Sequence, residues 1–420
     1  MIIDSLKYSG ACACGRTHKM ETVFSVVEGG CLKNIYAYLQ QYGLTGCTAA
    51  VYDENTYKAT ADRHPKVDFE IILPFENLHA NEHGVDLLLQ QLPGQAQVLL
   101  AIGSGTVHDI VRYCAYLKGL DFVSCPTAAS VDGFCSSVAA MTWHGCKKTL
   151  TAVAPKIVVA DLDIIKNAPI RLARSGFGDM VGKYIALTDW KIANILTGEC
   201  YCERIAKLTL EATEAVLRSA GGITCGDEST YEKLMGGLLL SGLAMQMMGN
   251  SRPASGAEHH ISHIIEMAPE GLEVHSDALH GEKVGVGTLL ALAEYRRLAN
   301  LKHLKFTDYC LYTQEEIQAV FGKLADEILG ENAADAAEGL TGAHLSECWQ
   351  AICKELQKLP TEKELENIYR TMGIKASLPD IHVPAEAEKD LLRCAPMVRN
   401  RLTLMRLRKC FIAEERGSVQ

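Results

Sequence analysis

The sequence lacks the features that mark exported, membrane-spanning and nucleic-acid-binding proteins. Its first eight residues contain neither a basic region nor a long apolar segment, so they do not resemble a secretory signal. The longest apolar stretch, from Val284 to Ala293, is interrupted by glycines and is far too short to cross a bilayer. Lys and Arg form no concentrated patch, and the formal net charge of -10 argues against a nucleic-acid groove. We therefore expect a cytoplasmic protein with no membrane span and no nucleic-acid partner.

The sequence also has no internal repeat, low-complexity tract or long linker, and its 420 residues are long for a single core. Sixteen cysteines are present, but without an export signal they are expected to be reduced thiols. Cys12-Ala-Cys14-Gly-Arg-Thr-His18 falls short of the usual four-ligand zinc patterns. We interpret that segment as a tight N-terminal turn.

Residues 30 to 165 alternate between strand-like and helix-like patterns. Helices are predicted at Leu32–Tyr42, Gly84–Gln91 and Asp109–Leu117. Strands are predicted at Cys47–Tyr52, Phe69–Pro74, Val98–Ile102, Phe122–Cys125, Ser136–Thr142 and Lys156–Ala160. Strands that alternate with helices of this length indicate a parallel sheet with helices on both faces.

From about residue 167 onward, apolar residues recur with a period near 3.6, which indicates helices. The helices are expected at Leu187–Leu196, Cys202–Leu217, Tyr231–Met248, Gly285–Arg297, Thr313–Leu329 and Thr361–Met372. The fold class is therefore α/β, with an α/β domain over residues 1–165 followed by an all-α domain over residues 166–420. The family resemblance given below implies that the first domain is Rossmann-like and binds a nucleotide, and that the active site lies in the cleft between the two domains.

A group of histidines suggests a divalent metal site. His259 and His263 are four residues apart, so on a helix they project from the same face. His280 follows after a distance that a helix–loop–helix connection can fold back, and Asp179 is the nearest acidic candidate. Neutral imidazole is a good ligand for zinc or nickel, and an Asp-His-His set leaves a position open for substrate. His18, His260 and His275 are interpreted as ordinary hydrogen-bonded histidines.

A glycine-rich turn predicts a phosphate site. The strand at Val98–Ile102 leads into Gly103, Ser104, Gly105, Thr106 and Val107 and then into a helix, whose first N–H groups and dipole attract phosphate. The sixth position of the dinucleotide fingerprint is His108 rather than glycine, and there is no Walker lysine. A tight strand–helix turn without a ligand therefore stays an alternative.

Two further segments end strands of the predicted sheet, where ligands of open parallel sheets gather. Asp53 could accept hydrogen bonds from ribose hydroxyls, although in the usual fingerprint the acidic residue follows the glycines. The loop after Pro126 carries hydroxyls suited to a pyrophosphate or a nicotinamide ribose, and Asp132 suits a substrate hydroxyl. The residues of this loop proposed for the cofactor are Thr127, Ala128, Ala129 and Ser130.

Several of these motifs together resemble the sn-glycerol-1-phosphate dehydrogenase family, with the bacterial AraM-type branch as the best fit. The motifs are the Gly-Ser-Gly-Thr-Val loop, Pro126-Thr-Ala-Ala-Ser-x-Asp-Gly, Gly178-Asp179-x-x-Gly-Lys183, Ser251-Arg-Pro-Ala-Ser-Gly-Ala-Glu-His259 and His280-Gly-Glu-Lys283. The family lies in the superfamily of glycerol dehydrogenase, iron-containing alcohol dehydrogenases and dehydroquinate synthase. The resemblance runs in order from about residue 30 to residue 300.

The resemblance implies a homodimer that reduces dihydroxyacetone phosphate to sn-glycerol 1-phosphate with NADH or NADPH, and a zinc or nickel ion in each subunit. Carried over by position, Asp179, His259 and His280 would hold the metal. His263 and Asp132 would contact the substrate. Its phosphate needs cations, and those beside the motifs are Arg252, Lys183 and Lys283, of which Arg252 suits a forked contact best. The cofactor would be held by Asp53, residues 103–107, residues 127–130 and Ser136. The carboxylate of Asp53 favours NAD, because it repels the 2′-phosphate of NADP.

Three alternatives stay open on the same fold. One is a lyase like dehydroquinate synthase, which uses Glu where this chain has Asp179 and a richer set of basic residues. Another is a dehydrogenase of unphosphorylated glycerol. The third is a non-catalytic sensor of nucleotide or metal, which the three intact ligand positions disfavour.

Overall fold

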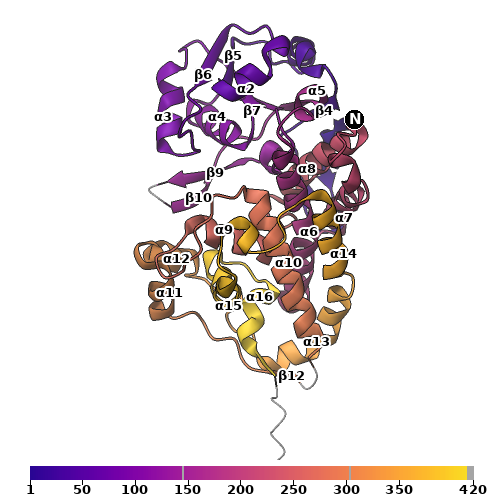
Figure 1. The fold of residues 1–420 in the computed structure, drawn as a ribbon, viewed down its shortest axis with the longest axis vertical. Helices are drawn as coiled ribbons and strands as arrows, with labels where there is room; N and C mark the ends of the chain where they lie inside the picture. The colour runs from indigo at the N-terminus through magenta and orange to yellow at the C-terminus, as the bar shows by residue number, and fades with distance from the viewer. Residues whose placement is uncertain (144–145, 302–303, 414–420) are drawn as a thin grey trace, which may run out of the picture. The chain divides into compact units, whose positions relative to one another are not determined.

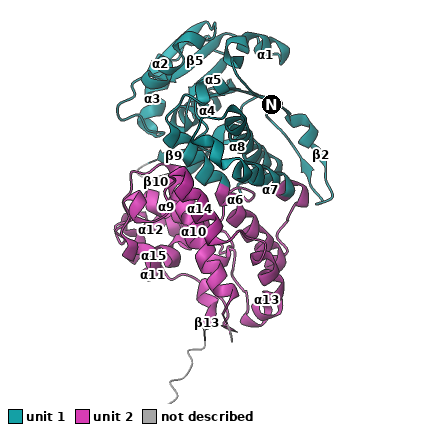
Figure 2. Cartoon of the chain, turned by 45° about the vertical axis from the view of Figure 1, so that its right-hand side comes forward, with its two compact units in different colours: residues 1–180, 207–251 teal, residues 181–206, 252–420 magenta. Residues whose placement is uncertain are grey.

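The computed structural model describes residues 1–143, 146–301 and 304–413, and the chain forms two compact units (Figure 2). Unit 1 comprises residues 1–180 and 207–251, and unit 2 comprises residues 181–206 and 252–420. Each unit is thus assembled from two separate segments of the chain. The sequence analysis placed a single domain boundary after residue 165, which is not one of the positions where these two units divide. As a domain boundary it stays a prediction.

Unit 1 is built on a seven-stranded sheet (Figure 1). Its strands are β1 (Ile2–Asp4), β4 (Phe24–Glu28), β5 (Thr48–Asp53), β6 (Phe69–Leu73), β7 (Val98–Gly103), β8 (Asp121–Pro126) and β11 (Ile157–Asp161). They lie in the order β1-β4-β11-β8-β7-β5-β6, and every neighbouring pair is parallel except β1 with β4. The predicted parallel sheet is confirmed. The sequence analysis did not predict β4 or the antiparallel edge strand β1.

Unit 1 also contains all three helices predicted between residues 30 and 165, and two small hairpins. The helices are α1 (Ile35–Gln41), α2 (Glu54–Ala59), α3 (Glu82–Gln91), α4 (Gly105–Lys118), α5 (Leu162–Ile165) and α8 (Glu228–Met248). The hairpins pair β2 (Gly10–Ala11) with β3 (Thr17–His18), and β9 (Val138–Trp143) with β10 (Cys146–Thr151). Two long helices, α6 (Ile170–Thr197) and α7 (Glu203–Arg218), have residues in both units.

Strand β7 shows why both faces of the sheet are covered. Its side chains alternate between two separate apolar clusters, as the period of two in a strand requires. Leu100 and Ile102 pack in the cluster that also contains the buried residues of α1. Leu99 and Ala101 pack in the other cluster, with the buried residues of α3 and α4. A strand that is buried on both faces reads as a continuous apolar run, which is the pattern from which it was predicted.

Unit 2 is mostly helical over its described residues. Its helices are α9 (Ala257–Met267), α10 (His280–Ala299), α11 (Gln314–Phe321), α12 (Ala325–Glu331), α13 (Gly342–Leu356), α14 (Glu362–Met372), α15 (Glu388–Cys394) and α16 (Leu404–Leu407), and β12 (Leu304–Phe306) pairs with β13 (Phe411–Ala413). The predicted helix over 313–329 is broken into α11 and α12 at Gly322, which has a φ of 51°. A positive φ ends an α-helix at low steric cost only at glycine. Helix α13 was not predicted.

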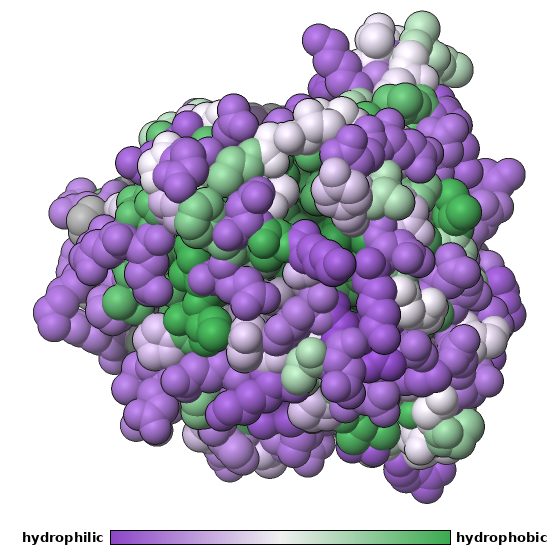
Figure 3. All heavy atoms as spheres, turned by 90° about the horizontal axis from the view of Figure 1, so that it is seen from above, coloured by the Kyte–Doolittle hydropathy of each residue, from purple (hydrophilic) through white to green (hydrophobic). Residues whose placement is uncertain are grey.

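No described helix is both long enough and apolar enough to cross a membrane. On the face drawn in Figure 3, hydrophilic residues predominate and hydrophobic residues show between them. The longest helix, α6, has 28 residues but carries Arg, Asp and Lys along its length.

A glycine in α6 brings this helix close to the loop that follows β8. A Cβ atom at Gly176 would lie 2.1 Å from the carbonyl oxygen of Ala129, a separation at which no side chain fits. The neighbouring Ser175 donates a hydrogen bond from Oγ to the carbonyl of Ser130 at 3.2 Å. One helical turn further on, Asp179 accepts a hydrogen bond from the backbone N–H of Asp132 at 3.0 Å. The close approach therefore fixes Asp179 against the loop that ends β8.

Candidate functional site

Two histidines of unit 2 are oriented by carboxylates. The Nδ1 atom of His259 lies 2.6 Å from a carboxylate oxygen of Glu258, and Nδ1 of His280 lies 2.8 Å from one of Glu266. An ionised carboxylate can only accept hydrogen bonds, so each Nδ1–H donates. Each Nε2 atom is then the nitrogen left to bind a metal. Paired carboxylates of this kind usually accompany histidine ligands in metal sites.

Asp179 completes the group of donors. One ligand atom each from Asp179, His259 and His280 lie within 4.8 Å of one another. The side chain of Asp179 is fully buried, and a buried carboxylate is costly unless it has hydrogen bonds and a positive partner. One carboxylate oxygen and two oriented imidazoles suit a divalent transition metal, with coordination positions left for a substrate. The residues present therefore fit the predicted metal.

His263 lies beside this group but is not one of its three members. Its ring centroid is 6.0 Å from that of His259 and 6.2 Å from that of His280. Desolvation lowers the pKa of His263 well below its ordinary value, and the positive charge of Arg399 adds to this effect while Glu266 opposes it. The neutral ring can donate one hydrogen bond and accept another. The sequence placed His263 on the same helical face as His259, and the structure agrees.

Asp189, on α6, holds the start of α9 in place. Its carboxylate accepts hydrogen bonds from the N–H of Ala257 at 2.9 Å, the N–H of Leu404 at 2.9 Å and the hydroxyl of Tyr295 at 2.7 Å. Desolvation raises the pKa of this carboxyl to about 7, although the hydrogen bonds oppose the shift. Gly256 is required beside it, because a Cβ there would lie 2.8 Å from the Asp189 carboxylate. This anchor sets the first turn of the helix that carries His259.

The glycine loop of unit 1 turns directly from β7 into α4. Ser104 is the N-cap of α4, and its side chain makes no capping hydrogen bond. The first N–H groups of the helix can therefore serve a phosphate. A Cβ at Gly103 would lie 2.6 Å from Cβ of Val107, so the turn requires glycine there. Gly105 and Thr106 form the first turn of the helix.

His108 has a structural role that the sequence analysis did not anticipate. Its Nδ1 lies 2.9 Å from the carbonyl of Ser104, and its Nε2 lies 2.9 Å from the hydroxyl of Ser124 in β8. Burial lowers the pKa of His108 to about 3, so the ring is neutral. Nδ1–H donates to the carbonyl, and Nε2 accepts from the hydroxyl. This side chain ties the glycine loop to the neighbouring strand, at the position where the usual fingerprint has glycine.

The other predicted cofactor residues follow strands β5 and β8. Because β5, β7 and β8 are parallel neighbours, their carboxyl ends lie side by side. Asp53, the glycine loop and Thr127 are all at these strand ends. Thr127 donates its N–H to the carbonyl of Gly103 at 2.9 Å. Asp53 caps α2, accepting the N–H groups of Asn55 and Thr56 at 2.9 and 2.7 Å. Its contact with a ribose stays a prediction.

Arg112 and Ser136 shape the segment that follows Asp132. The buried guanidinium of Arg112 donates to the carbonyls of Gly133 at 2.6 Å and Val138 at 2.9 Å. The hydroxyl of Ser136 bonds to the carbonyl and the N–H of Val138, each at 3.0 Å. In this structure Ser136 therefore holds its own loop, and its contact with the cofactor stays a prediction. The carboxylate of Asp132 accepts a hydrogen bond from Ser241 at 2.8 Å.

The arginine predicted to bind phosphate is engaged with a carboxylate. Arg252 is buried and makes a forked contact with Glu199, with Nε 2.6 Å from Oε1 and Nη2 on Oε2. Its Nη1 donates to the carbonyl of Leu402 at 2.9 Å. Nearby Lys183 is also buried and donates to the carbonyl of Ala254 at 3.1 Å. A phosphate contact by Arg252 stays a prediction, and it would compete with the contact to Glu199.

A different pair of arginines, Arg399 and Arg401, adds positive charge to this part of unit 2, where Arg399 forms an ion pair with Glu331 at 3.8 Å. Desolvation lowers the pKa of Arg401 to about 9, and the positive charges of Arg252 and Arg399 lower it further, while Glu199 and Glu258 oppose the shift. Arg401 donates to the carbonyl of Ser255 at 2.5 Å, beside the start of α9. Arg399 also repels a proton on His263. The sequence analysis did not single out Arg399 or Arg401, because they lie more than a hundred residues beyond the recognised motifs.

Comparisons with known proteins identify the family of this chain. Residues 26–169 match the family model described as iron-containing alcohol dehydrogenase. A glycerol-1-phosphate dehydrogenase (NAD(P)+) from Bacillus licheniformis is 33% identical over 413 residues, covering 96% of this chain and 92% of the relative. A protein of the same name from Geobacillus stearothermophilus is 31% identical over 407 residues, covering 94% of each. The chain belongs to the glycerol-1-phosphate dehydrogenase family.

Solved structures support the same fold for this member of the glycerol-1-phosphate dehydrogenase family. A probable glycerol dehydrogenase from Sinorhizobium meliloti superposes with a TM-score of 0.62 at 17% identity, covering 92% of this chain and 91% of that one. An iron-containing alcohol dehydrogenase from Corynebacterium glutamicum gives a TM-score of 0.60 at 14% identity, covering 95% and 97%. At such identities the likeness concerns the fold alone. The resemblance stated from the sequence motifs is confirmed by the full-length relatives.

The carboxylate–histidine pairs of this chain predict the effect of one substitution. Glu266→Gln removes the ionised acceptor that fixes His280, so metal affinity should fall by about 10- to 100-fold while the fold is retained. The apparent Kd for zinc and for nickel is measured by competition with a chelator. Glu270→Gln is the matched control, because the exposed carboxylate of Glu270 forms an ion pair with Lys323 at 2.9 Å on the surface. Equal affinities in the two variants would contradict the role given to Glu266.

Proposed function

We propose that this chain interconverts dihydroxyacetone phosphate and sn-glycerol 1-phosphate with NAD(P)(H), using one divalent metal ion held by Asp179, His259 and His280. The observation that supports it most strongly is similarity along nearly the whole chain to enzymes named glycerol-1-phosphate dehydrogenase. The donor group with its two orienting carboxylates supports the metal. Similarity over the full length also favours this reaction over the lyase, the glycerol dehydrogenase and the sensor.

The proposed ligands work because their geometry is set before substrate arrives. A bound divalent ion supplies Lewis-acid polarisation of the substrate carbonyl and stabilises the negative charge that develops on its oxygen. Glu258 and Glu266 keep Nε2 of His259 and His280 directed at the ion, and the N–H of Asp132 holds one oxygen of Asp179. Ligands that need not reorganise cost little free energy when the ion binds.

We assign the cofactor to the edge of the sheet in unit 1. NAD(P)H supplies the hydride for reduction of the ketone. The N–H groups at the start of α4 would bind its pyrophosphate, and Asp53 would bind its adenosine ribose. A carboxylate at this place repels a 2′-phosphate, so we propose a preference for NAD. The remaining cofactor contacts are assigned to residues 127–130 and to Ser136.

We assign the proton and the hydroxyl contacts of the substrate to His263 and Asp132. His263 is neutral because desolvation depresses its pKa. A neutral ring can hydrogen-bond a substrate hydroxyl and pass a proton toward the developing alkoxide. Asp132 is held by Ser241 and also fixes Asp179 through its own N–H. Asp132 thus offers its carboxylate to the substrate, while its backbone N–H orients the metal ligand Asp179.

We assign the phosphate of the substrate to Arg399 and Arg401, with Arg252 as a further candidate. Desolvation lowers the pKa of Arg401 to about 9, and repulsion from the positive charges of Arg252 and Arg399 lowers it further. A dianionic phosphate would remove that repulsion and accept forked hydrogen bonds from guanidinium groups. These contacts would make the site bind dihydroxyacetone phosphate more tightly than unphosphorylated dihydroxyacetone.

The proposal also covers the identity of the metal ion, the location of the enzyme and its oligomeric state. The ion is zinc or nickel, since imidazole and carboxylate suit both. The enzyme is assigned to the cytoplasm as a homodimer. Reduced thiols support that location, because none of the fifteen cysteines whose side chains the structure describes forms a disulfide.

The proposed reaction is tested by NADH oxidation with dihydroxyacetone phosphate after the metal is stripped and zinc or nickel is added back. Turnover should return with one of these ions. His259→Ala should lower kcat/KM by about 100-fold or more, because Lewis-acid stabilisation is worth several kcal/mol. His275→Ala, at an exposed histidine, should leave the rate unchanged. A folded protein that shows no turnover with either ion and either cofactor would overturn the proposal.

The proposed phosphate contact predicts a change in selectivity. Arg401→Gln should raise KM for dihydroxyacetone phosphate by about 10- to 100-fold, because a charge-assisted hydrogen bond is worth about 1.5–3 kcal/mol. The rate with unphosphorylated dihydroxyacetone should change little, so the ratio of kcat/KM for the two ketones falls. Arg393→Gln is the control, at an exposed arginine paired with Asp390. An unchanged ratio in Arg401→Gln would remove Arg401 from the phosphate site.

A further inference from the structure

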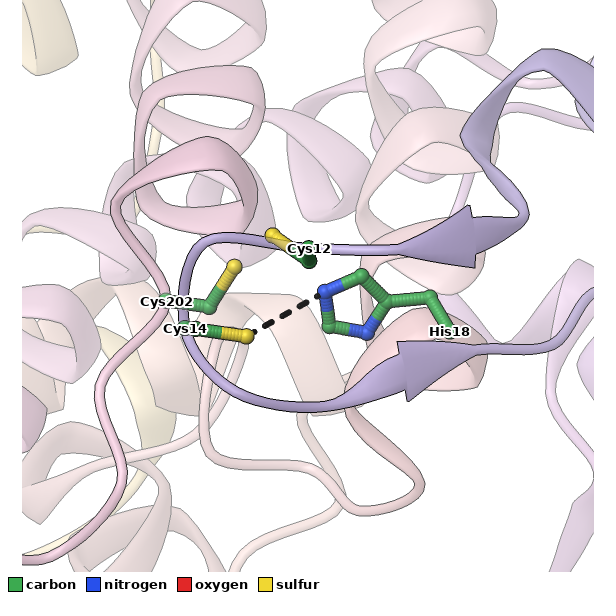
Figure 4. Close-up of side chains that lie close together, drawn as sticks. All are labelled: Cys12, Cys14, His18 and Cys202. Carbon is green, nitrogen blue, oxygen red and sulfur yellow. Dashed lines mark hydrogen bonds between the residues drawn. The ribbon is translucent and has the colours of Figure 1, made fainter.

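The N-terminal hairpin places two cysteines and a histidine together (Figure 4). Strands β2 and β3 pair with Gly10 opposite His18, and residues 12–16 form the turn. Cys12 donates its N–H to the carbonyl of Arg16 at 2.9 Å and accepts the N–H of Gly15 at 3.0 Å. Gly15 has a φ of 84°, which glycine tolerates best. The predicted tight turn is confirmed.

A third cysteine from a distant part of the sequence joins them. Cys202 precedes α7, and its sulfur points toward the hairpin in Figure 4. One ligand atom each from Cys12, Cys14, His18 and Cys202 all lie within 4.8 Å of one another. Only three of these residues lie in one segment of the sequence, so the pattern by itself falls short of a four-ligand site. Cys202 could not be added to it without the fold.

The ring of His18 is oriented as a metal ligand would be. Its Nδ1 lies 2.7 Å from the carbonyl of Met247, which can only accept, so Nδ1–H donates and Nε2 carries the lone pair. Nε2 lies 3.5 Å from the sulfur of Cys14. Zn–S bonds of about 2.3 Å and Zn–N bonds of about 2.0–2.1 Å at the tetrahedral angle place S and N roughly 3.5 Å apart. The observed distance between Nε2 of His18 and the sulfur of Cys14 therefore equals the distance expected between two ligands of one zinc ion.

Burial and donor chemistry separate this group from the Asp-His-His group. Cys202 and His18 are almost completely buried, with exposures of 0% and 2%, and Cys12 and Cys14 are partly buried. Three thiolates and one imidazole form a four-coordinate set with no position left for substrate, which is the structural type of zinc site. Asp179, His259 and His280 offer only three donors and no sulfur.

We propose that Cys12, Cys14, His18 and Cys202 bind one structural zinc ion, in addition to the ion proposed for Asp179, His259 and His280. Binding takes the three cysteines as thiolates, so three protons are released as the ion enters. The ion joins the hairpin to a residue more than 180 positions along the chain, so it closes a long loop and stabilises the folded state. The proposal stands whether or not the reaction proposed above is correct.

The test uses the full chain purified under reducing conditions with zinc, followed by metal analysis and cobalt substitution. The wild type should hold two zinc ions per chain, and Cys202→Ser should hold one. Cobalt in the wild type should give the thiolate-to-metal charge-transfer absorption that an Asp-His-His site cannot give. Cys225→Ser, at an exposed cysteine, should keep both ions and the absorption. Asp179→Asn should lose the other ion and keep the absorption.

Each opposite result overturns the proposal. One zinc ion in both the wild type and Cys202→Ser would exclude the second site. Absence of the charge-transfer absorption in cobalt-loaded wild type would do so even if Cys202→Ser failed to fold. An intact mass lower by two hydrogen atoms under reducing conditions would show a disulfide among these cysteines in place of the metal.

Discussion

The proposed metal site depends on one arrangement, the hydrogen bonding of Glu258 and Glu266 to the Nδ1 atoms of His259 and His280. Imidazole has two nitrogens, and a hydrogen bond donated by one of them fixes the tautomer and orientation in which the other can bind a metal. Both histidines lie in the first turn of a helix, and Asp189 and Gly256 determine where the first of those helices starts. The fold of unit 2 serves that placement.

The positively charged side chains around the site differ in whether the protein itself engages them. Arg252 and Lys183 are buried and are engaged with Glu199 and with the carbonyl of Ala254. Desolvation lowers the pKa of Arg401, and repulsion from Arg252 and Arg399 lowers it further. The cations nearest to the recognised motifs therefore serve the structure, and the repulsion among the later arginines is what an anionic substrate would relieve. An overall charge of -10 says nothing of this local arrangement.

The sequence predicted most of the sheet, and it singled out Asp179, His259 and His280, whose donor atoms lie close together in the structure. Continuous apolar runs, separated by helical segments, predicted β5 to β8 and β11, and the i, i+4 spacing predicted the shared face of His259 and His263. It did not give Glu258 and Glu266 as partners, because contact between a carboxylate and a ring nitrogen depends on rotamers. It did not give Cys202 beside Cys12 and Cys14, because contact over such a separation depends on the whole fold. His108 was recorded only as a departure from a glycine motif, and its two hydrogen bonds explain that departure.

The central claim concerns which side chains hold the ion. Crystals grown with zinc or nickel, and measured at the absorption edge of that metal, locate the ion by anomalous scattering. The account predicts a peak bonded to the carboxylate of Asp179 and to Nε2 of His259 and His280, with His263 outside the coordination sphere. A peak bonded to His263 in place of His280, or no peak at these residues in an active enzyme, would contradict it.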